Sequence, residues 1–260
     1  MVSKKAIGNF IINKRSIVPN FITMLNMTMG FFAIIYAGKG DVSSIAIAGV
    51  LVFIGSICDA SDGAVARAMH VESPVGVQLD SLADGIAYGI APAIIAYQGF
   101  LSKLPMIYGG IGLGMIIAPI YPICAIYRLA RFNTCNDEKD GFNGLPSPAA
   151  GILVASIPAL FPETLFFGRI EFLSIIEIFL KSNVFFVILY LTLGFLMVSN
   201  IDYSKLFSVL YKKGKIIILV ALILMGISLV LFQMWIVFLF SLMYVAIGVI
   251  FYIIKNVTSV

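Results

Sequence analysis

Long apolar segments alternate with short polar ones along most of the chain. Because a helix that crosses a bilayer needs about 20 predominantly apolar residues, this pattern predicts about eight spans. The predicted spans cover residues 19–37, 43–67, 76–100, 105–132, 149–160, 183–199, 216–232 and 235–254. Pro119 and Pro122 lie inside the fourth span and predict a kink there. Residues 161–181 combine an apolar face with charged positions, so we expect an interfacial helix.

Basic residues set the predicted orientation of these spans. Four precede the first span and four share one later loop: Lys4, Lys5, Lys14 and Arg15, then Lys205, Lys212, Lys213 and Lys215. Counted from a cytoplasmic N-terminus, the spans place loops 68–75, 133–148 and 200–215 on the inner side, where Lys and Arg are enriched. Residues 1–17 are expected to form a basic interfacial segment without a removable signal. We therefore expect a multi-pass protein of a prokaryotic plasma membrane.

The composition agrees with this pattern. Hydrophobic residues make up 61% of the 260 positions and the mean hydropathy is +1.06, which indicates an all-α polytopic membrane protein with one membrane domain. The net charge of +4 comes without a basic tract, so we expect no nucleic-acid partner. The three cysteines lack metal-type spacing and His70 is the only histidine, which argues against a histidine metal site or a Ser-His-Asp apparatus.

Four aspartates interrupt the apolar pattern, namely Asp59, Asp62, Asp80 and Asp84. One Asp at a helix centre costs about 3 kcal/mol on insertion scales, so four together need a shared counter-charge or a water-filled site. Asp59 and Asp62 are three residues apart, and Asp80 and Asp84 are four apart, so each pair projects from one face of its helix. Two such helices side by side bring four carboxylates together, and divalent cations would keep them ionised. The alternatives are buried structural polar groups or the lining of an ion path.

Three small residues and one arginine accompany the aspartates. Gly63 and Gly76 carry no side chain, which lets a helix backbone or a phosphate approach closely. Ala66 leaves space one turn further along, and Arg67 supplies a planar positive group suited to a phosphate. We therefore expect a phosphate compound beside the metal site.

Residues 59–84 resemble the signature of the CDP-alcohol phosphotransferases, D-x2-D-G-x2-A-R-x8-G-x3-D-x3-D, at every fixed position. Within that family, the flanking sequence is similar to the phosphatidylserine synthase branch. This similarity covers the runs 79–84, 89–93, 128–133 and 142–149. One departure is Gln78, because many members of the branch carry Glu there. The exchange removes a charge from that position.

The resemblance implies a six-helix membrane core over residues 18–200, usually in a homodimer, with residues 201–260 adding a basic loop and two more spans. It implies an enzyme of phospholipid biosynthesis that uses an alcohol and divalent cations to displace CMP from a CDP-linked lipid. In the serine branch, the phosphatidyl group of CDP-diacylglycerol, or of an archaeal CDP-diether lipid, passes to the hydroxyl of L-serine. The products are phosphatidylserine, or archaetidylserine, and CMP.

The resemblance also implies roles for single residues. Asp59, Asp62 and Asp80 would bind two divalent cations, Mg2+ or Mn2+. Asp84 would be both a ligand and the general base, two roles that conflict because a bound cation lowers the proton affinity of a carboxylate. The implied contacts of the CDP-lipid are Asn20, Thr23, Asp59, Gly63, Ala66, Arg67, Ser73 and Gly76. Asn20 is equally consistent with a helix start after Pro19.

A serine acceptor needs a cation for its carboxylate. Arg128 and Arg131 lie at the cytoplasmic end of the fourth predicted span, and Arg can bind a carboxylate with two parallel hydrogen bonds. Asn133 and Gln78 are further candidates for serine binding. The arginines would alternatively set the orientation of the span or contact lipid headgroups.

The chemistry and the acceptor leave competing hypotheses. The motif offers no Cys or His nucleophile, which favours a single in-line displacement over a covalent enzyme intermediate. Another family member would use glycerol phosphate, inositol or inositol phosphate as the acceptor. From a different class, a cation transporter would also use intramembrane carboxylates.

Overall fold

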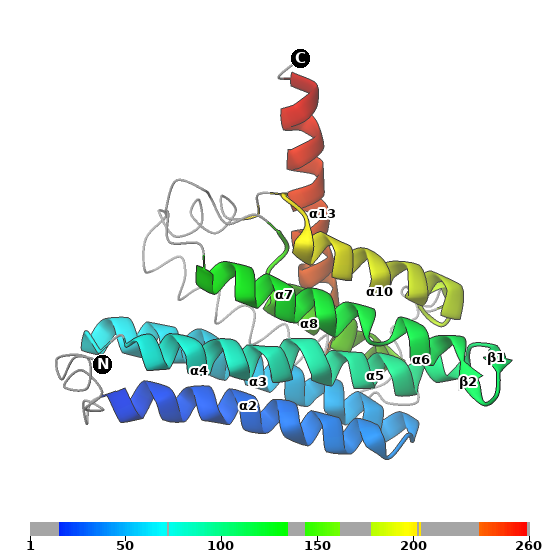
Figure 1. Ribbon diagram of the computed structural model, residues 1–260, viewed down its shortest axis with the longest axis horizontal. Helices are drawn as coiled ribbons and strands as arrows, with labels where there is room; N and C mark the ends of the chain where they lie inside the picture. The colour runs from blue at the N-terminus through cyan, green and yellow to red at the C-terminus, as the bar shows by residue number, and fades with distance from the viewer. Residues whose placement is uncertain are drawn as a thin grey trace, which may run out of the picture.

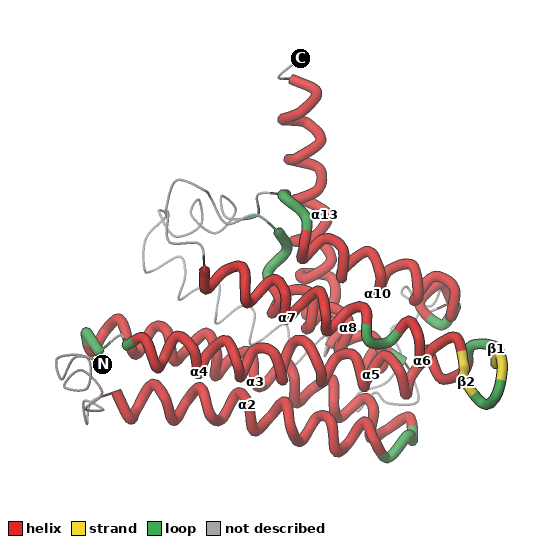
Figure 2. Tube along the Cα trace, viewed as in Figure 1, coloured by secondary structure: helices red, strands yellow, loops and turns green. Residues whose placement is uncertain are grey.

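A computed structural model describes residues 16–71, 73–134, 144–161, 178–201, 203 and 234–258 of the chain. Most of these residues are helical (Figure 2). The longer helices are α2 (Ile17–Gly38), α3 (Val42–Met69), α7 (Ile120–Thr134), α10 (Asn183–Val198) and α13 (Met234–Thr258). Three helical pieces follow one another without a break, namely α4 (Pro74–Asp84), the π-helical turn η2 (Gly85–Ile90) and α5 (Ala91–Gly99). The shorter pieces are η3 (Leu101–Lys103), α6 (Leu113–Ile117), α8 (Ser147–Ser156) and η4 (Ile157–Leu160).

The helices form a layered bundle. α2 packs along α3 and along the α4–η2–α5 segment, and α7 packs against η2 and α10. α8 contacts α3, η2 and α13. Figure 1 shows α13 running across the direction shared by α2, α3 and α5. The acidic segments of α3 and α4 therefore lie within one bundle of closely packed helices.

Five helical stretches are long and apolar enough to cross a membrane. They cover Ile17–Gly38, Val42–Met69, Pro74–Lys103, Leu113–Thr134 and Met234–Ile254, with two shorter apolar helices at Ser147–Leu160 and Asn183–Val198. The prediction of an all-α polytopic membrane protein is confirmed. The predicted span 216–232, the segment 1–15 and most of the predicted interfacial helix 161–181 lie outside the described residues.

Side-chain caps and one left-handed residue delimit the helices that carry the aspartates. The Asp41 carboxylate accepts a hydrogen bond of 2.9 Å from the Ser44 amide at the start of α3, and this bond lowers the pKa of Asp41. α3 ends at His70, which has φ of 54°. The Ser73 hydroxyl then caps α4 by accepting a 3.0 Å bond from the Gly76 amide. His70 and the Ser73 cap thus delimit the short turn between the two acidic segments.

The fourth predicted span is present as Leu113–Thr134, but its predicted start near Pro105 was wrong. Residues 106–112 form a β-hairpin of β1 (Met106–Tyr108) and β2 (Ile111–Gly112), and the helix begins at Leu113. Gly109 and Gly110 have φ of 58° and 83°, a backbone that two glycines adopt without strain in a tight hairpin turn. The predicted interruption is present: α6 ends at Ile117 and α7 begins at Ile120, directly after Pro119.

Small residues set the spacing between the helices. A Cβ atom at Gly30 of α2 would lie 2.8 Å from the Ala87 Cα in η2. A Cβ atom at Gly49 of α3 would collide with the backbone carbonyl of Ala155 in α8. Such contacts are typical of membrane helices, where small residues let backbones approach each other. The aspartate-bearing helices are therefore held by backbone contacts on both α2 and α8.

The larger apolar core surrounds α8. Leu153 of α8 and Ile157 of η4 are fully buried, and Trp235 and Phe238 of α13 belong to the same cluster. The C-terminal helix α13 therefore packs directly on the helices that form the bundle.

Replacing Gly49 with Ala tests the contact between α3 and α8. The added methyl group must displace the Ala155 carbonyl, so we expect a loss of about 1–3 kcal/mol in stability. Gly38→Ala is the matched control, because a Cβ atom at Gly38 meets no atom within 4 Å. Thermal unfolding of both variants in detergent micelles measures the difference. Equal unfolding midpoints in the two variants would contradict this packing.

Candidate active site

Three carboxylates from two helices converge. Asp59 and Asp62 come from α3 and Asp80 comes from α4, and one carboxylate oxygen from each lies within 4.8 Å of the others. Asp62 is buried, whereas Asp59 and Asp80 are partly exposed. The spacing in the sequence predicted this convergence, and the structure brings these three residues together.

Asp84 lies one turn beyond Asp80 at the end of α4 and is only 8% exposed. The Asn26 side-chain amide of α2 donates a hydrogen bond of 3.5 Å to its carboxylate. Asn26 is fully buried, and its own Oδ1 atom has no hydrogen-bond partner among the described residues. Gly55 of α3 makes room for it, since a Cβ atom there would lie 2.8 Å from that Oδ1. Asn26 of α2 thus binds Asp84 through its amide nitrogen, and its amide oxygen remains available as an acceptor.

Asn26 was not predicted as a site residue from the sequence. Asn20, Thr23 and Asn26 occur at intervals of three residues, which places them along one side of α2. This polar stripe in an otherwise apolar helix was a signal that could have identified Asn26.

Thr23 acts on the acidic cluster. Its hydroxyl lies 2.5 Å from Asp62 Oδ2 and 3.1 Å from the Pro19 carbonyl oxygen. A hydroxyl carries one proton. When Thr23 donates this proton to Asp62, it cannot also donate it to the Pro19 carbonyl oxygen. The structure therefore places Thr23, expected as a contact of the CDP-lipid, against a predicted metal ligand.

The other expected CDP-lipid contacts form two groups. A Cβ atom at Gly76 would lie 3.2 Å from Ser73 Oγ and 3.3 Å from Asn20 Oδ1, so these three residues meet between α2 and the start of α4. A Cβ atom at Gly63 would lie 3.3 Å from Nη1 of Arg67, so the arginine side chain extends back along α3. Arg67 is exposed and its charge acts on Asp62.

Ala66, the remaining small residue of the motif, is partly buried on the same helix. The expected space for a phosphate beside Ala66 stays a prediction.

The two arginines of α7 have different surroundings. Arg128 is 7% exposed, and its Nη1 donates a 2.5 Å hydrogen bond to Ser147 Oγ at the start of α8. The charges of Arg128 and Asp84 act on each other. Arg131 instead donates to the carbonyl oxygens of Val198 (3.2 Å) and Ser199 (3.3 Å) at the end of α10. The charge of Arg128 therefore acts on Asp84, whereas the hydrogen bonds of Arg131 connect α7 to α10.

A small polar cluster joins α4 to α7. The Asn133 amide donates to Ser81 Oγ at 2.9 Å and to Gln78 Oε1 at 3.4 Å. The Ser81 hydroxyl lies 3.1 Å from Asn133 Oδ1. The structure thus brings the predicted residues Gln78 and Asn133 together next to Asp80. Ser81 was not identified from the sequence, because its role depends on how α7 packs on α4.

The acidic cluster fits divalent cations. Oxygen ligands from carboxylates suit Mg2+, Mn2+ and Ca2+. Asp59, Asp62 and Asp80 supply such oxygens within one small volume, and the Asn26 Oδ1 atom is a further buried acceptor beside Asp84. The donor set therefore matches the metal site that the spacing predicted.

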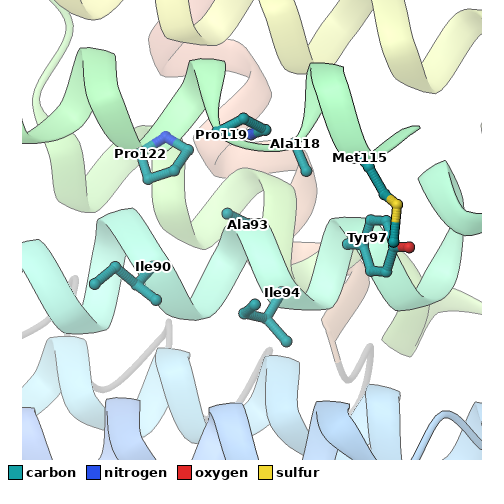
Figure 3. A pocket seen from close by; sticks show the side chains of 8 residues that line it. All are labelled: Ile90, Ala93, Ile94, Tyr97, Met115, Ala118, Pro119 and Pro122. Carbon is teal, nitrogen blue, oxygen red and sulfur yellow. The ribbon is translucent and has the colours of Figure 1, made fainter. Parts of the chain in front are cut away.

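A separate apolar groove of about 340 Å3 lies between α5 and the break from α6 to α7 (Figure 3). It is lined by Ile90, Ala93, Ile94, Tyr97, Met115, Ala118, Pro119 and Pro122. None of these residues belongs to the acidic cluster, so the groove is not the site of the carboxylate chemistry.

Known proteins resemble this chain over most of its described core. The family model for CDP-alcohol phosphatidyltransferase matches residues 16–198. A Helicobacter pylori protein is 35% identical over 210 residues, which cover 78% of this chain and 76% of the relative. A Methanocaldococcus jannaschii protein is 32% identical over 196 residues, which cover 75% and 78%.

A Mycobacterium leprae protein is 34% identical over 155 residues, and the match spans about half the length of that relative (47%). All three relatives are named CDP-diacylglycerol–serine O-phosphatidyltransferase. The family match includes both acidic helices and α7, which carry the site described above. The chain belongs to the CDP-alcohol phosphatidyltransferase family.

Proposed function

We propose that this protein transfers the phosphatidyl group of a CDP-linked lipid to the hydroxyl of L-serine and releases CMP. The observation that carries the proposal is the convergence of three carboxylates next to Asp84, with the buried Arg128 beside it. The names of the bacterial and archaeal relatives support serine as the acceptor. Those names give CDP-diacylglycerol as the lipid; an archaeal CDP-diether is the alternative lipid of this proposal.

Asp59, Asp62, Asp80 and Asp84 would hold two divalent cations, Mg2+ or Mn2+. When bound, these cations would neutralise the diphosphate and stabilise charge on the attacking and leaving oxygens. Asn20, Ser73 and Gly76 would receive the CDP group, since they meet at the turn that leads into α4.

The diphosphate would lie at the end of the site that carries Arg67. Arg67 would pair with a phosphate oxygen, and Gly63 and Ala66 leave room for that phosphate beside α3. Thr23 holds Asp62 at 2.5 Å and so orients one ligand at this end.

Asp84 would act as the general base. Asn26 fixes its carboxylate from α2, and a positioned base contributes about 10²–10⁴-fold to a rate. Asp84 takes the proton of the serine hydroxyl as the serine oxygen forms a bond to the phosphorus that bears the lipid. The bond from that phosphorus to the oxygen of CMP breaks, and CMP leaves with the electron pair.

Arg128 would bind the serine carboxylate. Its bond to Ser147 orients the guanidinium on the Asp84 side of α7. Gln78 and Asn133 would line the same subsite through the polar cluster on α4. Arg131 would contribute by fixing α7 on α10, because its guanidinium is bonded to the carbonyl oxygens there.

The buried charges favour serine over a phosphorylated acceptor. Among the residues that the structure describes, Arg128 is the only buried basic side chain. Glycerol phosphate or inositol phosphate would bring a dianionic group that needs more cationic partners. One buried arginine suits the single carboxylate of serine.

The assembly and orientation extend this proposal. We place the acidic site at the cytoplasmic face of a prokaryotic plasma membrane, since the basic residues gather in the loops on that side. Residues 18–200 would form the catalytic core of a homodimer, with residues 201–260 added to it.

Replacing Asp84 with Asn tests the general base. We expect serine-dependent CMP release from CDP-diacylglycerol with Mn2+ to fall about 10²–10⁴-fold, because the amide cannot accept the proton. Asp41→Asn is the control, since Asn also caps helices and Asp41 lies outside the site. CMP release is followed with purified protein and a panel of alcohols. Equal rates for the two variants would contradict the role of Asp84, and CMP release without a need for serine would contradict the acceptor.

Replacing each site arginine with Lys tests the assignment of substrates. Arg128→Lys should raise the KM for serine about tenfold or more, because Lys keeps the charge but cannot form the two parallel hydrogen bonds of a guanidinium, and should leave the KM for the CDP-lipid nearly unchanged. Arg67→Lys should raise the KM for the CDP-lipid instead. Steady-state kinetics with each substrate varied in turn measures both values. A larger change in the KM for the CDP-lipid than for serine in Arg128→Lys would exclude the proposed serine subsite.

A further inference from the structure

Tyr88 has a buried hydroxyl group that the chemistry above does not use. The residue is fully buried in the π-helical turn η2. Its hydroxyl has no hydrogen-bond partner among the described residues. A buried donor without a partner is unfavourable, and such groups in native proteins often have a functional reason. π-Helical turns are likewise frequent at functional sites.

The backbone of Tyr88 is fixed from two sides. A Cβ atom at Gly151 of α8 would lie 2.9 Å from both Cα and Cβ of Tyr88, so the two helices are in direct contact. The Tyr121 hydroxyl of α7 donates a 3.3 Å hydrogen bond to the Tyr88 carbonyl oxygen. The tyrosine ring is therefore placed by neighbouring helices and has little freedom to turn elsewhere.

The Tyr88 hydroxyl interacts electrostatically with the acidic cluster. Side chains on a helix lean toward its N-terminus, and for Tyr88 this is the direction of Asp84, four residues earlier. The carboxylates whose charges act on the Tyr88 hydroxyl are those of Asp59, Asp84 and Asp80. All three belong to the proposed metal site.

Two other buried tyrosines have a different arrangement. The Tyr121 hydroxyl donates to a backbone carbonyl, and the Tyr190 hydroxyl donates to the Ala118 carbonyl oxygen at 2.6 Å. These bonds satisfy the hydroxyl groups within the protein fold itself. The Tyr88 hydroxyl instead has no such bond among the described residues, and the charges that act on it are those of the acidic cluster.

We propose that Tyr88 is a positioning residue that donates a hydrogen bond to the Asp59 carboxylate when divalent cations are bound. A carboxylate has about four lone-pair sites, so Asp59 binds a cation and accepts the phenol proton at the same time. Ligating carboxylates are commonly oriented by such partners, whose loss costs about 10–100-fold in metal affinity. The inference rests on the proposed metal site and adds a residue that sets its affinity.

The test compares Tyr88→Phe with Tyr190→Phe in the purified full chain without substrates. Mn2+ binding is measured by the loss of the free-ion signal in electron paramagnetic resonance. Tyr88→Phe should raise the Kd for Mn2+ about 10–100-fold, because it removes the hydroxyl and keeps the ring. Tyr190→Phe should leave that Kd unchanged, because its hydroxyl binds the Ala118 carbonyl oxygen.

Thermal unfolding without metal separates positioning from folding. Tyr88→Phe should be at least as stable as the wild type, since it removes an unsatisfied buried hydroxyl, whereas Tyr190→Phe should be less stable. A Kd for Tyr88→Phe within about twofold of the wild-type value, against the larger change expected for a ligand-orienting group, would overturn the proposal.

Failure of the proposed enzyme activity would be visible separately. If the wild type binds Mn2+ but gives no serine-dependent CMP, the acceptor is wrong, and the Kd values still decide the role of Tyr88. If the wild type binds no Mn2+, both the metal site and this role of Tyr88 are overturned.

Discussion

Carboxylates from α3 and α4 meet inside a bundle of apolar helices, and the polar groups packed around them respond to that concentration of negative charge. Ionised aspartates in such a place repel each other and are poorly solvated. Polar groups stabilise Asp62 and Asp84. Thr23 and Asn26 of α2 form hydrogen bonds with their carboxylates, and the positive charge of Arg128 in α7 acts on Asp84. The remaining need for positive charge is what makes the cluster suited to divalent cations.

Close backbone packing and the site depend on the same contacts. Gly30 brings α2 against η2, and Gly55 makes space for the Asn26 side chain that reaches Asp84. Gly151 brings α8 against Tyr88, and Ser147 at the start of that same helix binds Arg128. α8 carries none of the aspartates, but its contacts with Tyr88 and Arg128 help to position these two residues. Substitutions at these small residues will alter stability and the geometry of the carboxylates together.

Periodicity alone was sufficient to predict the aspartate pairs, because residues three or four apart share one face of a helix. The order of the spans placed Arg128 and Arg131 together near the level of the aspartates, and Pro119 and Pro122 predicted a kink because proline breaks helical hydrogen bonds. Periodicity did not predict Asn26 or Ser81, because their partners lie on other helices and depend on the rotation of α2 and α7. The hairpin at 106–112 was missed because its apolar residues extend the hydrophobic run; only Gly109 and Gly110 mark the turn.

We propose that the acidic cluster binds a pair of divalent cations. Electron paramagnetic resonance of the purified chain, titrated with Mn2+, detects such a pair. Two ions about 3.5–4 Å apart would couple magnetically, so the account predicts two bound Mn2+ per chain and a spin-coupled spectrum. In Asp80→Asn the coupled signal should be lost. A single isolated Mn2+ signal, or no stoichiometric binding by the wild type, would contradict the account.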